Sequence, residues 1–511
     1  MTLPHKVSSL TWRIIIPYFE FYWSRILEHS GYIDGQFVKG EGAEFAVESP
    51  SDESIVDTVA SVSAAQVDAA IAAARRAFDD GSWSGLSMKE RGEAMTRFGE
   101  AMRAREGTLR DLAVKEAGCP IASPVMFAQV DGPLRMTDEI IGMALKMPEI
   151  EDNPLPLHER VTPYFVVQSI KRWSPVGVVS AISAYNVPLF TAFWKVIPAL
   201  MTGNTVILRP NPLTPLSSMV FAEAAEEAGL PPGVFNLLIE NGIEGGQKIS
   251  TDPAVDLVSF TGSCDVGVKV AQQAAPTLKR LVLELGGKSA QIVLPDRVDA
   301  APFLGQMVCG SHAGQGCVLG TRIFVPEENK AEVLEKMGEM ASALKIGPAS
   351  DPATQLGPVI SAGQRARCES FTKAAVDAGG KVVAGGKRPD HMDKGFYYEA
   401  TILDLPDNSN PAAQEEIFGP VVGVIGYRDL DHAVEMANDS RFGLSGHVHG
   451  ADKVKALEVA KRIRSGAVNV NAAMSSSYAS GGGIKMSGIG RERGIEGLRE
   501  FQIQTTMNIG G

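Results

Sequence analysis

Cysteine is scarce in this 511-residue sequence, which contains five cysteines and no Cys-x-x-Cys pair. Cys119, Cys264, Cys309, Cys317 and Cys368 are odd in number and far apart, and no group of cysteines and histidines has the spacing of a metal site. This pattern excludes a disulfide framework and indicates no zinc site, so we expect no metal ion. Free thiols in a long chain fit the reducing cytoplasm, which we expect as the location of the protein.

Basic residues are also in deficit, with 48 Lys and Arg against 60 Asp and Glu and a formal net charge of −12. No stretch gathers Lys and Arg into a basic stripe, which argues against a nucleic-acid partner. The 53 glycines and 30 prolines are spread along the chain without low-complexity tracts, which indicates many turns and not disorder. The length and an ordinary hydrophobic content of 44% predict two or three domains.

No hydrophobic run is long enough to span a membrane. The most apolar segment is RIIIPYFEFYWSRIL at residues 13–27, which proline, glutamate and arginine interrupt, whereas a span needs about 20 mostly apolar residues. No small-residue cleavage site follows, which argues against a secretory signal. We interpret residues 1–30 as an extension outside the core, with a membrane-surface helix as the alternative. The folded part is expected to begin near residues 31–38.

Hydrophobic periodicity predicts helices first. Residues 63–78 place apolar side chains at helical spacing behind a serine cap, a second helix follows over residues 87–106, and helix continues to about residue 145. Residues 158–179 then alternate β-branched and aromatic side chains with polar ones, as in a hairpin or an edge strand.

Short apolar strands then alternate with helices. The predicted strands are residues 177–183, 204–210, 234–239, 255–260 and 280–285. This rhythm is typical of a parallel sheet covered on both faces, and such sheets bind ligands at the carboxyl ends of their strands. A second α/β region follows over about residues 286–470, before a Gly-rich segment and a tail. The residues alone therefore predict a nucleotide-type α/β domain followed by another α/β domain.

Two turns could receive a phosphate group. Gly262 and Ser263 stand between a predicted strand and helix, where the serine can cap the helix and free N–H groups can face an anion. Gly242 and Gly246 form a second flexible turn. Neither matches Gly-x-Gly-x-x-Gly after the first strand, so the ordinary dinucleotide fingerprint is absent. Each turn alone is equally typical of a plain strand–helix connection.

Three residues could carry chemistry, and each has a plainer interpretation. Cys317 follows Gly-Gln-Gly, where flexible backbone could approach a substrate, but a lone cysteine among small residues is more often buried filling. Glu284 ends a predicted strand as a general base would, or it forms an ion pair with Lys288. Asn186 could donate to an oxyanion, or it caps the helix that follows it. Their types complement one another as nucleophile, base and oxyanion donor.

Several ordered motifs resemble the aldehyde dehydrogenase superfamily. The glutamate motif LELGGKSA and the cysteine motif GQGCVLGTR place Glu284 and Cys317 33 residues apart, as in that family. The segments SAYNVPLFTAFWKVIPALMTGNTVILRP, FTGSCDVG, EEIFGPV and GGGIKMSGIGRERG follow the same resemblance, which runs from about residue 31 to residue 501.

The resemblance implies an α/β fold with a Rossmann-type cofactor domain, an α/β catalytic domain and a small β oligomerisation element. Its domains would be residues 31–284, with the N-terminal helices, the NAD(P) site and an oligomerisation hairpin at about 157–173; residues 285–480, the catalytic domain; and residues 481–511, with an oligomerisation tail. A homodimer or homotetramer is therefore expected.

The resemblance also implies oxidation of an aldehyde to a carboxylic acid with a nicotinamide cofactor. Cys317 would attack the aldehyde, Asn186 and the Cys317 N–H would hold the oxyanion, and Glu284 would activate the water that hydrolyses the thioester. The implied cofactor-binding residues are Ser183, Ala184, Tyr185, Asn186, Arg209, Pro212, Gly242, Gly246, Gly262, Ser263, Gly267, Glu416 and Phe418.

The sequence departs from the family's commonest pattern near the adenosine ribose. Arg209 stands where a lysine is usual, and Pro212 stands where many NAD-preferring members have a glutamate. That carboxylate binds the ribose 2′-hydroxyl and repels a 2′-phosphate. NAD remains the expected cofactor, with NADP left open.

The implied substrate pocket is lined by Val187, Phe190, Trp194, Val318 and Tyr478. Its apolar character and the lack of an evident cation favour an aliphatic, terpenoid or aromatic aldehyde. Two alternatives stay open: a CoA-acylating aldehyde dehydrogenase, whose members typically lack the general-base glutamate, and a non-catalytic scaffold, whose members usually lose the cysteine or the glutamate.

Overall fold

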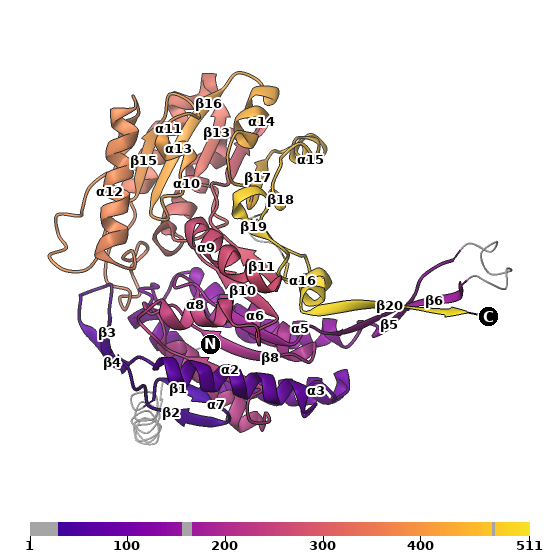
Figure 1. Ribbon diagram of the computed structural model, residues 1–511. Helices are drawn as coiled ribbons and strands as arrows, with labels where there is room; N and C mark the ends of the chain where they lie inside the picture. Colours follow the sequence, from indigo (N-terminus) through magenta and orange to yellow (C-terminus); the bar gives the residue numbers. More distant parts are fainter. Residues whose placement is uncertain (1–28, 156–165, 473–475, 511) are drawn as a thin grey trace, which may run out of the picture.

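The computed structural model describes residues 29–155, 166–472 and 476–510. Two α/β lobes lie one above the other, and a long β arm extends from the lower lobe (Figure 1). Nearly all of the predicted extension, residues 1–30, and most of the first part of the predicted hairpin lie outside the described residues. In the part of the chain that the structure describes, no helix is long and apolar enough to cross a membrane.

The lower lobe contains an eight-stranded sheet in the order β19-β11-β10-β7-β8-β9-β1-β2. Its strands are β1 (Gly31–Ile33), β2 (Gln36–Val38), β7 (Val178–Ile182), β8 (Thr205–Arg209), β9 (Phe235–Leu238), β10 (Leu257–Thr261), β11 (Arg280–Glu284) and β19 (Gly488–Ile489). The five central strands are parallel, as their continuous apolar runs predict, because both faces are covered. The three outer strands are antiparallel to their neighbours.

Helices cover both faces of this sheet. One layer contains α2 (Ala64–Asp79), α8 (Glu244–Thr251) and α9 (Cys264–Ala274), which contact one another in that order. The other contains α3 (Met88–Ala104), α5 (Gly132–Ala144), α6 (Pro188–Met201) and α7 (Met219–Ala228), with α4 (Glu106–Lys115) and the π-helical turn η1 (Phe127–Asp131) beside them. Helix α6 is buried along almost its whole length, because it is apolar on every side.

The upper lobe contains a seven-stranded sheet in the order β14-β15-β16-β13-β12-β17-β18, parallel except for β14. Its strands are β12 (Ala290–Val293), β13 (Arg322–Pro326), β14 (Lys381–Ala384), β15 (Thr401–Asp404), β16 (Val421–Tyr427), β17 (Ser445–His449) and β18 (Ala467–Val470). Its helices are α10 (Ala301–Gly310), α11 (Lys330–Ser342), α12 (Ala362–Asp377), α13 (Pro411–Gln414), α14 (Leu430–Asn438) and α15 (Lys453–Ala460). The predicted division into domains at residues 284 and 285 stays a prediction.

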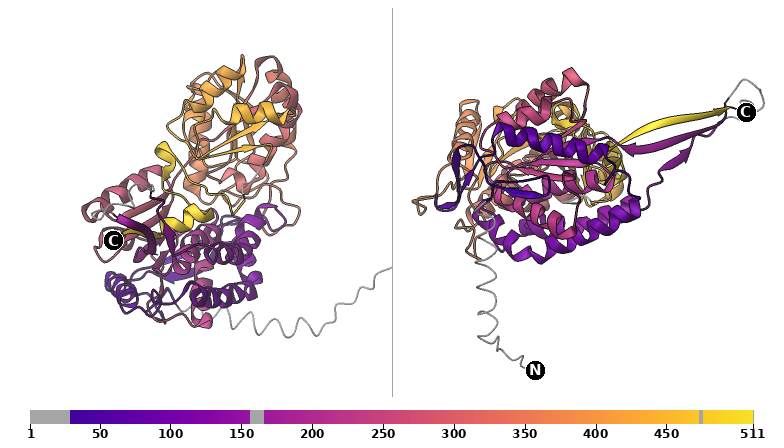
Figure 2. Two further views of the ribbon diagram at one scale, coloured as in Figure 1. Left: turned by 90° about the vertical axis from the view of Figure 1, so that its right-hand side faces the viewer. Right: turned by 60° about the horizontal axis from the view of Figure 1, so that its bottom comes forward.

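The arm is a three-stranded antiparallel sheet in the order β20-β6-β5 (Figures 1 and 2). Its strands are β5 (Ile150–Asp152), β6 (Val166–Pro175) and β20 (Gln502–Gly510), which follows α16 (Gly494–Glu500). Residues 158–179 were expected to form a hairpin or an edge strand; β6 is not an edge strand, because the C-terminal strand pairs along its whole length and β5 pairs with it on the other side. A separate hairpin pairs β3 (Glu44–Glu48) with β4 (Ile55–Ala60).

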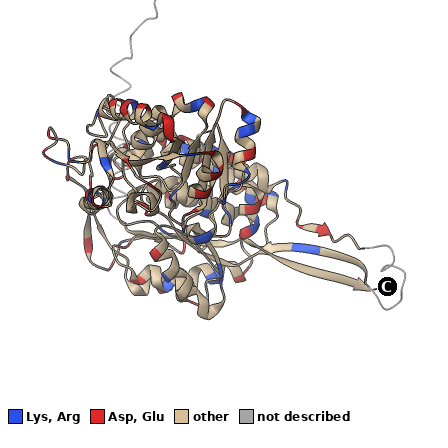
Figure 3. Ribbon diagram, turned by 90° about the horizontal axis from the view of Figure 1, so that it is seen from above, with Lys and Arg blue, Asp and Glu red and all other residues tan. Residues whose placement is uncertain are grey.

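Positions of Lys and Arg and positions of Asp and Glu are intermixed along the ribbon in the view from above (Figure 3). The chain as a whole carries 12 more acidic than basic residues. The two sheets, and not a single charged surface, therefore set the place of the site.

Candidate active site

The strand order of the lower sheet reverses between β7 and β10. The chain runs from β7 to β8 on one side and later adds β10 on the other side. In open α/β sheets, ligands bind at the carboxyl ends of the strands at such a point. Ser183 and Ala184 follow β7 there, and Gly262 and Ser263 follow β10. The structure thus places two predicted cofactor segments at one edge.

Cys317 lies half-buried in the loop between α10 and β13. Burial raises the pKa of its thiol to about 12, and the negative charges of Glu416 and Glu284 add to the shift. The resting residue is therefore a neutral thiol, which needs a proton acceptor or a nearby positive charge before it attacks. The effect of Glu284 on this thiol places the two predicted catalytic groups near each other.

The glycines around Cys317 allow close contacts between backbone segments. At Gly314, φ is +71° and a Cβ would lie 2.0 Å from the carbonyl oxygen of Gly419, so this glycine serves a backbone contact and not an approach to substrate. At Gly287, which follows the Glu284 strand, a Cβ would lie 2.7 Å from the Cys317 carbonyl oxygen. The glutamate and cysteine motifs therefore pack directly against each other.

Glu284 ends β11, and its Oε1 has no hydrogen-bond partner among the described residues. Burial raises the pKa of its carboxyl to about 8, the carboxylate of Glu492 adds to the shift, and the Lys195 ammonium opposes it. The alternative partner, Lys288, is buried among other charges: burial and then the Arg322 guanidinium lower the pKa of its amine to about 7. An unpaired carboxyl whose pKa lies near physiological pH is suited to general-base catalysis.

A buried ion pair beside Glu284 was not predicted. Lys195 Nζ lies 2.6 Å from Glu492 Oε1 and also donates to Ser259 Oγ at 3.2 Å. The lysine is fully buried, which is rare unless the charge is paired. A signal was present in the sequence, because Lys195 is the single charged residue of the apolar helix α6.

Asn186 is buried, and its side chain points to the cysteine loop. Its Nδ2 donates to the main-chain carbonyl oxygen of Gln315 at 2.8 Å. The main-chain carbonyl oxygen of Asn186 accepts from Gln129 Nε2 at 2.6 Å. Asn186 does not cap α6, since Val187 is at that position and no side chain caps it. Gln129, which sequence reasoning missed, comes from the π-helical turn η1, a feature often found at functional sites.

The turn after β10 and the N-terminus of α9 have features that suit the binding of a phosphate group. Ser263 caps α9, and its Oγ accepts from the N–H of Val266 at 3.4 Å. A Cβ at Gly262 would lie 2.4 Å from the Phe260 ring, and a Cβ at Gly267 would lie 2.5 Å from Leu285. Glycine at these positions lets the turn stay tight and lets α9 pack closely on the sheet.

Glu416 and its neighbours come from the segment before β16 in the upper lobe, and they contact the segments of Gly287 and Tyr185. Glu416 Oε1 accepts from the Gly287 N–H at 2.9 Å, and burial raises the pKa of its carboxyl. Phe418 has a positive φ of 61° and its ring packs edge-on against Tyr185, with 5.9 Å between the ring centres. The positive φ of a bulky residue is costly and is characteristic of functional sites.

The predicted ribose region contains an ion pair that the sequence did not predict. Arg209 Nε lies 2.6 Å from Glu240 Oε1, and Arg209 Nη2 donates to the Gly242 carbonyl oxygen. The Arg209 side chain also lies against Gly246, where a Cβ would be 3.2 Å from Nε. Pro212 is half-buried nearby in the sequence, in the loop after β8.

Comparison with known proteins identifies the family. The sequence matches the model of the aldehyde dehydrogenase family over residues 37–507. The chain belongs to the aldehyde dehydrogenase family. It is 35% identical to betaine aldehyde dehydrogenase of Bacillus subtilis (strain 168), with 92% of this chain and 95% of the relative covered. It is 36% identical to 3-succinoylsemialdehyde-pyridine dehydrogenase of Pseudomonas sp, with 94% and 98% covered.

Solved structures agree with this assignment and with the expected fold. A mutant of aldehyde dehydrogenase C from Pseudomonas syringae, in complex with NAD+ and octanal, is 36% identical to this dehydrogenase. The match has a TM-score of 0.87 and covers 94% of this chain and 97% of that one. Betaine aldehyde dehydrogenase from Staphylococcus aureus, as a point mutant with NAD+, gives 34% identity, a TM-score of 0.89 and coverage of 95% and 98%.

Similar solved structures hold NAD+, and the predicted cofactor residues of this aldehyde dehydrogenase have features that suit it. Ser183 Oγ is buried without a partner among the described residues. Ile243 and Val266, at the starts of α8 and α9, expose 66% and 43% of their surfaces, as walls for a flat aromatic base would. At Gly286, a Cβ would lie 2.2 Å from Glu416 Oε2, so the carboxylate has room only because the glycine lacks a side chain. Sequence reasoning missed the two exposed apolar residues.

The predicted substrate-pocket residues differ in exposure. Val318 and Tyr478 are exposed, at 46% and 58%, while Val187 and Phe190 are half-buried. Trp194 is fully buried, and its ring packs edge-on against Phe190 with 6.3 Å between the ring centres. The first four are therefore at least partly accessible, Trp194 is not, and the substrate pocket stays a prediction.

A cation that the sequence did not predict lies near the two predicted catalytic residues. Arg493 has a positive φ of 67°, and its positive charge lowers the pKa of both Cys317 and Glu284, although burial dominates both groups. A Cβ at Gly481 would lie 2.0 Å from the Arg493 Nη2. The glycine therefore leaves space for the guanidinium at the Gly-rich segment.

Proposed function

We propose that this dehydrogenase oxidises an aldehyde to the carboxylic acid with NAD+, through a thiohemiacetal and a thioester on Cys317 that water hydrolyses. The observation that carries the proposal is the convergence of Cys317, Asn186 and Glu284. Asn186 is hydrogen-bonded to the Cys317 loop at 2.8 Å, and the charge of Glu284 reaches the thiol. NAD+ is proposed because two similar structures hold it and because the crevice residues fit it.

In the first half-reaction, the Cys317 thiol loses its proton to water, and the thiolate sulfur attacks the aldehyde carbon, whose carbonyl oxygen becomes an alkoxide. The Asn186 amide has two N–H groups, of which one is bonded to Gln315 and the other is left for this oxyanion. The Cys317 N–H is the second donor. When bound, the nicotinamide would supply the hydride acceptor for the tetrahedral carbon that Cys317 and Asn186 hold in place. The residue is then left as a thioester.

In the second half-reaction, Glu284 removes a proton from the water that attacks the thioester, and the Cys317 thiolate leaves. The free Oε1 of Glu284 supplies the acceptor. This role disfavours the CoA-acylating alternative, in which a thiol and not water resolves the thioester. The presence of both Cys317 and Glu284 disfavours a non-catalytic scaffold.

Asn186→Ala is expected to lower kcat by about 100- to 1,000-fold, which is typical for loss of one oxyanion donor. The variant keeps the nucleophile and the base but leaves the alkoxide with one N–H donor. Steady-state turnover at saturating aldehyde measures the effect. Asn329→Ala, which changes the half-buried asparagine at the start of α11 in the upper lobe, is the control. A loss below about fivefold would contradict the role of Asn186.

We propose an apolar aldehyde, aliphatic, terpenoid or aromatic, as the substrate. Val187, Phe190 and Val318 give the pocket apolar surface, and a relative that is 36% identical binds octanal. Arg493 favours a second candidate, an aldehyde with a carboxylate at its far end, because a guanidinium binds carboxylates well.

The test is the absorbance of reduced nicotinamide with purified enzyme and a panel of aldehydes, with NAD+ and without or with CoA. We expect octanal to be oxidised without CoA and with the higher kcat/KM. If a semialdehyde of similar length is preferred, and Arg493→Leu removes that preference, the second candidate replaces the first. Turnover only with CoA, or none with any aldehyde, would overturn the proposed function.

We also propose a cytoplasmic homodimer or homotetramer. All five cysteines are free, which suits a reducing compartment. The arm of β5, β6 and β20 extends well beyond the body of the subunit, as an element that contacts another subunit does (Figure 2). Light scattering of the purified protein tests the oligomeric state.

A further inference from the structure

The carboxylate missing at Pro212 has a counterpart on the next strand. Glu240 follows β9, and Arg209 ends β8. These strands are parallel neighbours, with Leu208 paired to Leu237, so both side chains lie at the carboxyl edge of the sheet. Glu240 is 5% exposed, which is rare for a glutamate unless its charge is compensated.

Every polar contact that the structure gives the Glu240 carboxylate is internal. Oε1 lies 2.6 Å from Arg209 Nε and accepts from the Gly246 N–H at 2.8 Å, and Oε2 accepts from the Gly245 N–H at 2.9 Å. A guanidinium together with the first amides of a helix forms an anion site. In this chain the site beside Arg209 is therefore filled by the protein's own carboxylate. A Cβ at Gly245 would lie 2.6 Å from Oε2, so the carboxylate is tightly enclosed.

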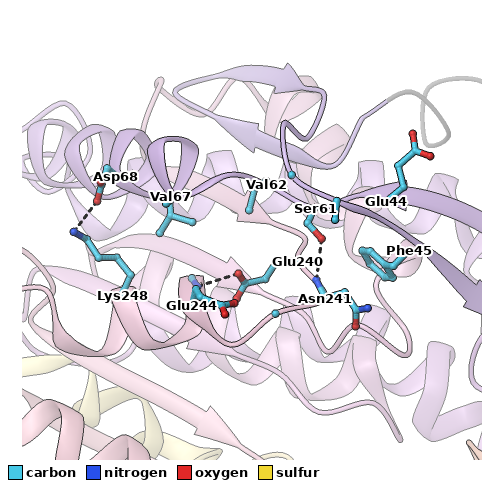
Figure 4. A pocket seen from close by; sticks show the side chains of 15 residues that line it. Glu44, Phe45, Ser61, Val62, Val67, Asp68, Glu240, Asn241, Glu244 and Lys248 are labelled. Carbon is cyan, nitrogen blue, oxygen red and sulfur yellow. Dashed lines mark hydrogen bonds and ion pairs between the residues drawn. The ribbon is translucent and has the colours of Figure 1, made fainter.

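The surroundings of Glu240 are acidic. It borders a cavity of ≈ 500 Å³ between α2, the start of α8 and the β3–β4 hairpin, whose lining includes three further carboxylates, those of Glu44, Asp68 and Glu244 (Figure 4). Lys248 is the cation of this lining, and Asp68 neutralises it at 2.9 Å. The lining as a whole therefore adds negative charge on the side of Glu240 that faces this cavity.

We propose that Glu240 is the residue that selects NAD+ over NADP+ in this enzyme. It holds Arg209 in an internal ion pair, so the guanidinium cannot bind a 2′-phosphate, and its own charge repels one. A ribose with a free 2′-hydroxyl brings no charge and is accepted. The inference rests on the proposed function only in that the crevice binds a nicotinamide dinucleotide.

The test compares NADH and NADPH binding, by quenching of protein fluorescence, and kcat/KM for the two oxidised cofactors. The wild-type enzyme is expected to prefer NAD+ by about 100-fold or more, because like charges in contact strongly disfavour a partner. Glu240→Gln should reduce this preference at least tenfold, mainly by lowering KM for NADP+ with kcat nearly unchanged. Glu48→Gln, which removes an exposed charge of β3 outside this lining, should leave the preference within about twofold.

A second pair of variants separates charge from structure. Glu240→Asp keeps the charge and should keep the preference, and Pro212→Glu in the Glu240→Gln background should restore it. A wild-type enzyme without preference, or a Glu240→Gln enzyme with the wild-type ratio, would overturn the proposal. Selective NADH binding without turnover of any aldehyde would leave this inference standing and count against the proposed function instead.

Discussion

Cys317→Ala is expected to abolish aldehyde-dependent reduction of NAD+, with kcat falling by about four orders of magnitude or more, as removal of a nucleophile does. The half-buried thiol forms the only covalent bond between enzyme and substrate in the proposed reaction, and the neighbouring groups cannot replace it. The Asn186 amide donates and Glu284 activates water, but neither forms the bond that turns the aldehyde into a hydride donor. NADH production under saturating octanal measures the change.

The cofactor crevice should be unaffected by the same substitution, because its contacts lie on β7, β10 and the Glu416 segment. The Kd for NADH is therefore expected within about twofold of wild type. Cys264→Ala is the matched control, since this cysteine is also near the crevice but donates to the Met486 carbonyl oxygen at 3.0 Å. Turnover retained in Cys317→Ala, or an equal loss in Cys264→Ala, would rule out the assignment of the nucleophile.

The parallel strands of the lower sheet could be predicted from sequence because each is a local signal. Strand β7, for example, was expected at residues 177–183 and spans Val178–Ile182, a run of five buried residues between turn signals. A strand buried on both faces must be apolar at every position, so its run is visible without knowledge of its neighbours. The Ser263 cap of α9 was visible for the same reason.

Features that depend on distant partners could not be predicted in this way. The pairing of β6 with the C-terminal strand joins segments more than 300 residues apart, and it makes a predicted edge strand central. The ion pair of Lys195 with Glu492 spans 297 residues. In the sequence, Glu240 is an ordinary polar residue after a strand, and only the packing of β8 beside β9 shows that it meets Arg209. The resemblance to the family assigned roles to residues at matching motif positions, but it assigned none to Lys195, Glu492 or Glu240.

Glu284→Gln is expected to slow steady-state turnover by about 100-fold or more while leaving the first burst of NADH nearly intact. The burst reports attack by Cys317 and hydride loss, whereas steady turnover also needs water to be activated. The variant should also lose a pH dependence. Because burial raises the pKa of Glu284 to about 8, the wild-type carboxylate forms as pH rises through about 8, and steady turnover should rise with it. Stopped-flow and steady-state rates between pH 6 and 9 test both points.

Glu492→Gln is the informative companion to that experiment. The Glu492 charge raises the pKa of Glu284, and Lys195, which pairs with Glu492 at 2.6 Å, lowers it. Removing the carboxylate of Glu492 takes away the repulsion and frees the lysine charge to act on Glu284. Both effects stabilise the ionised form of Glu284. The rise of steady-state turnover with pH should therefore move to lower pH without disappearing. If the rise of turnover in Glu492→Gln stays at the same pH, another group titrates. If burst and steady turnover fall equally in Glu284→Gln, Glu284 also acts in the first half-reaction.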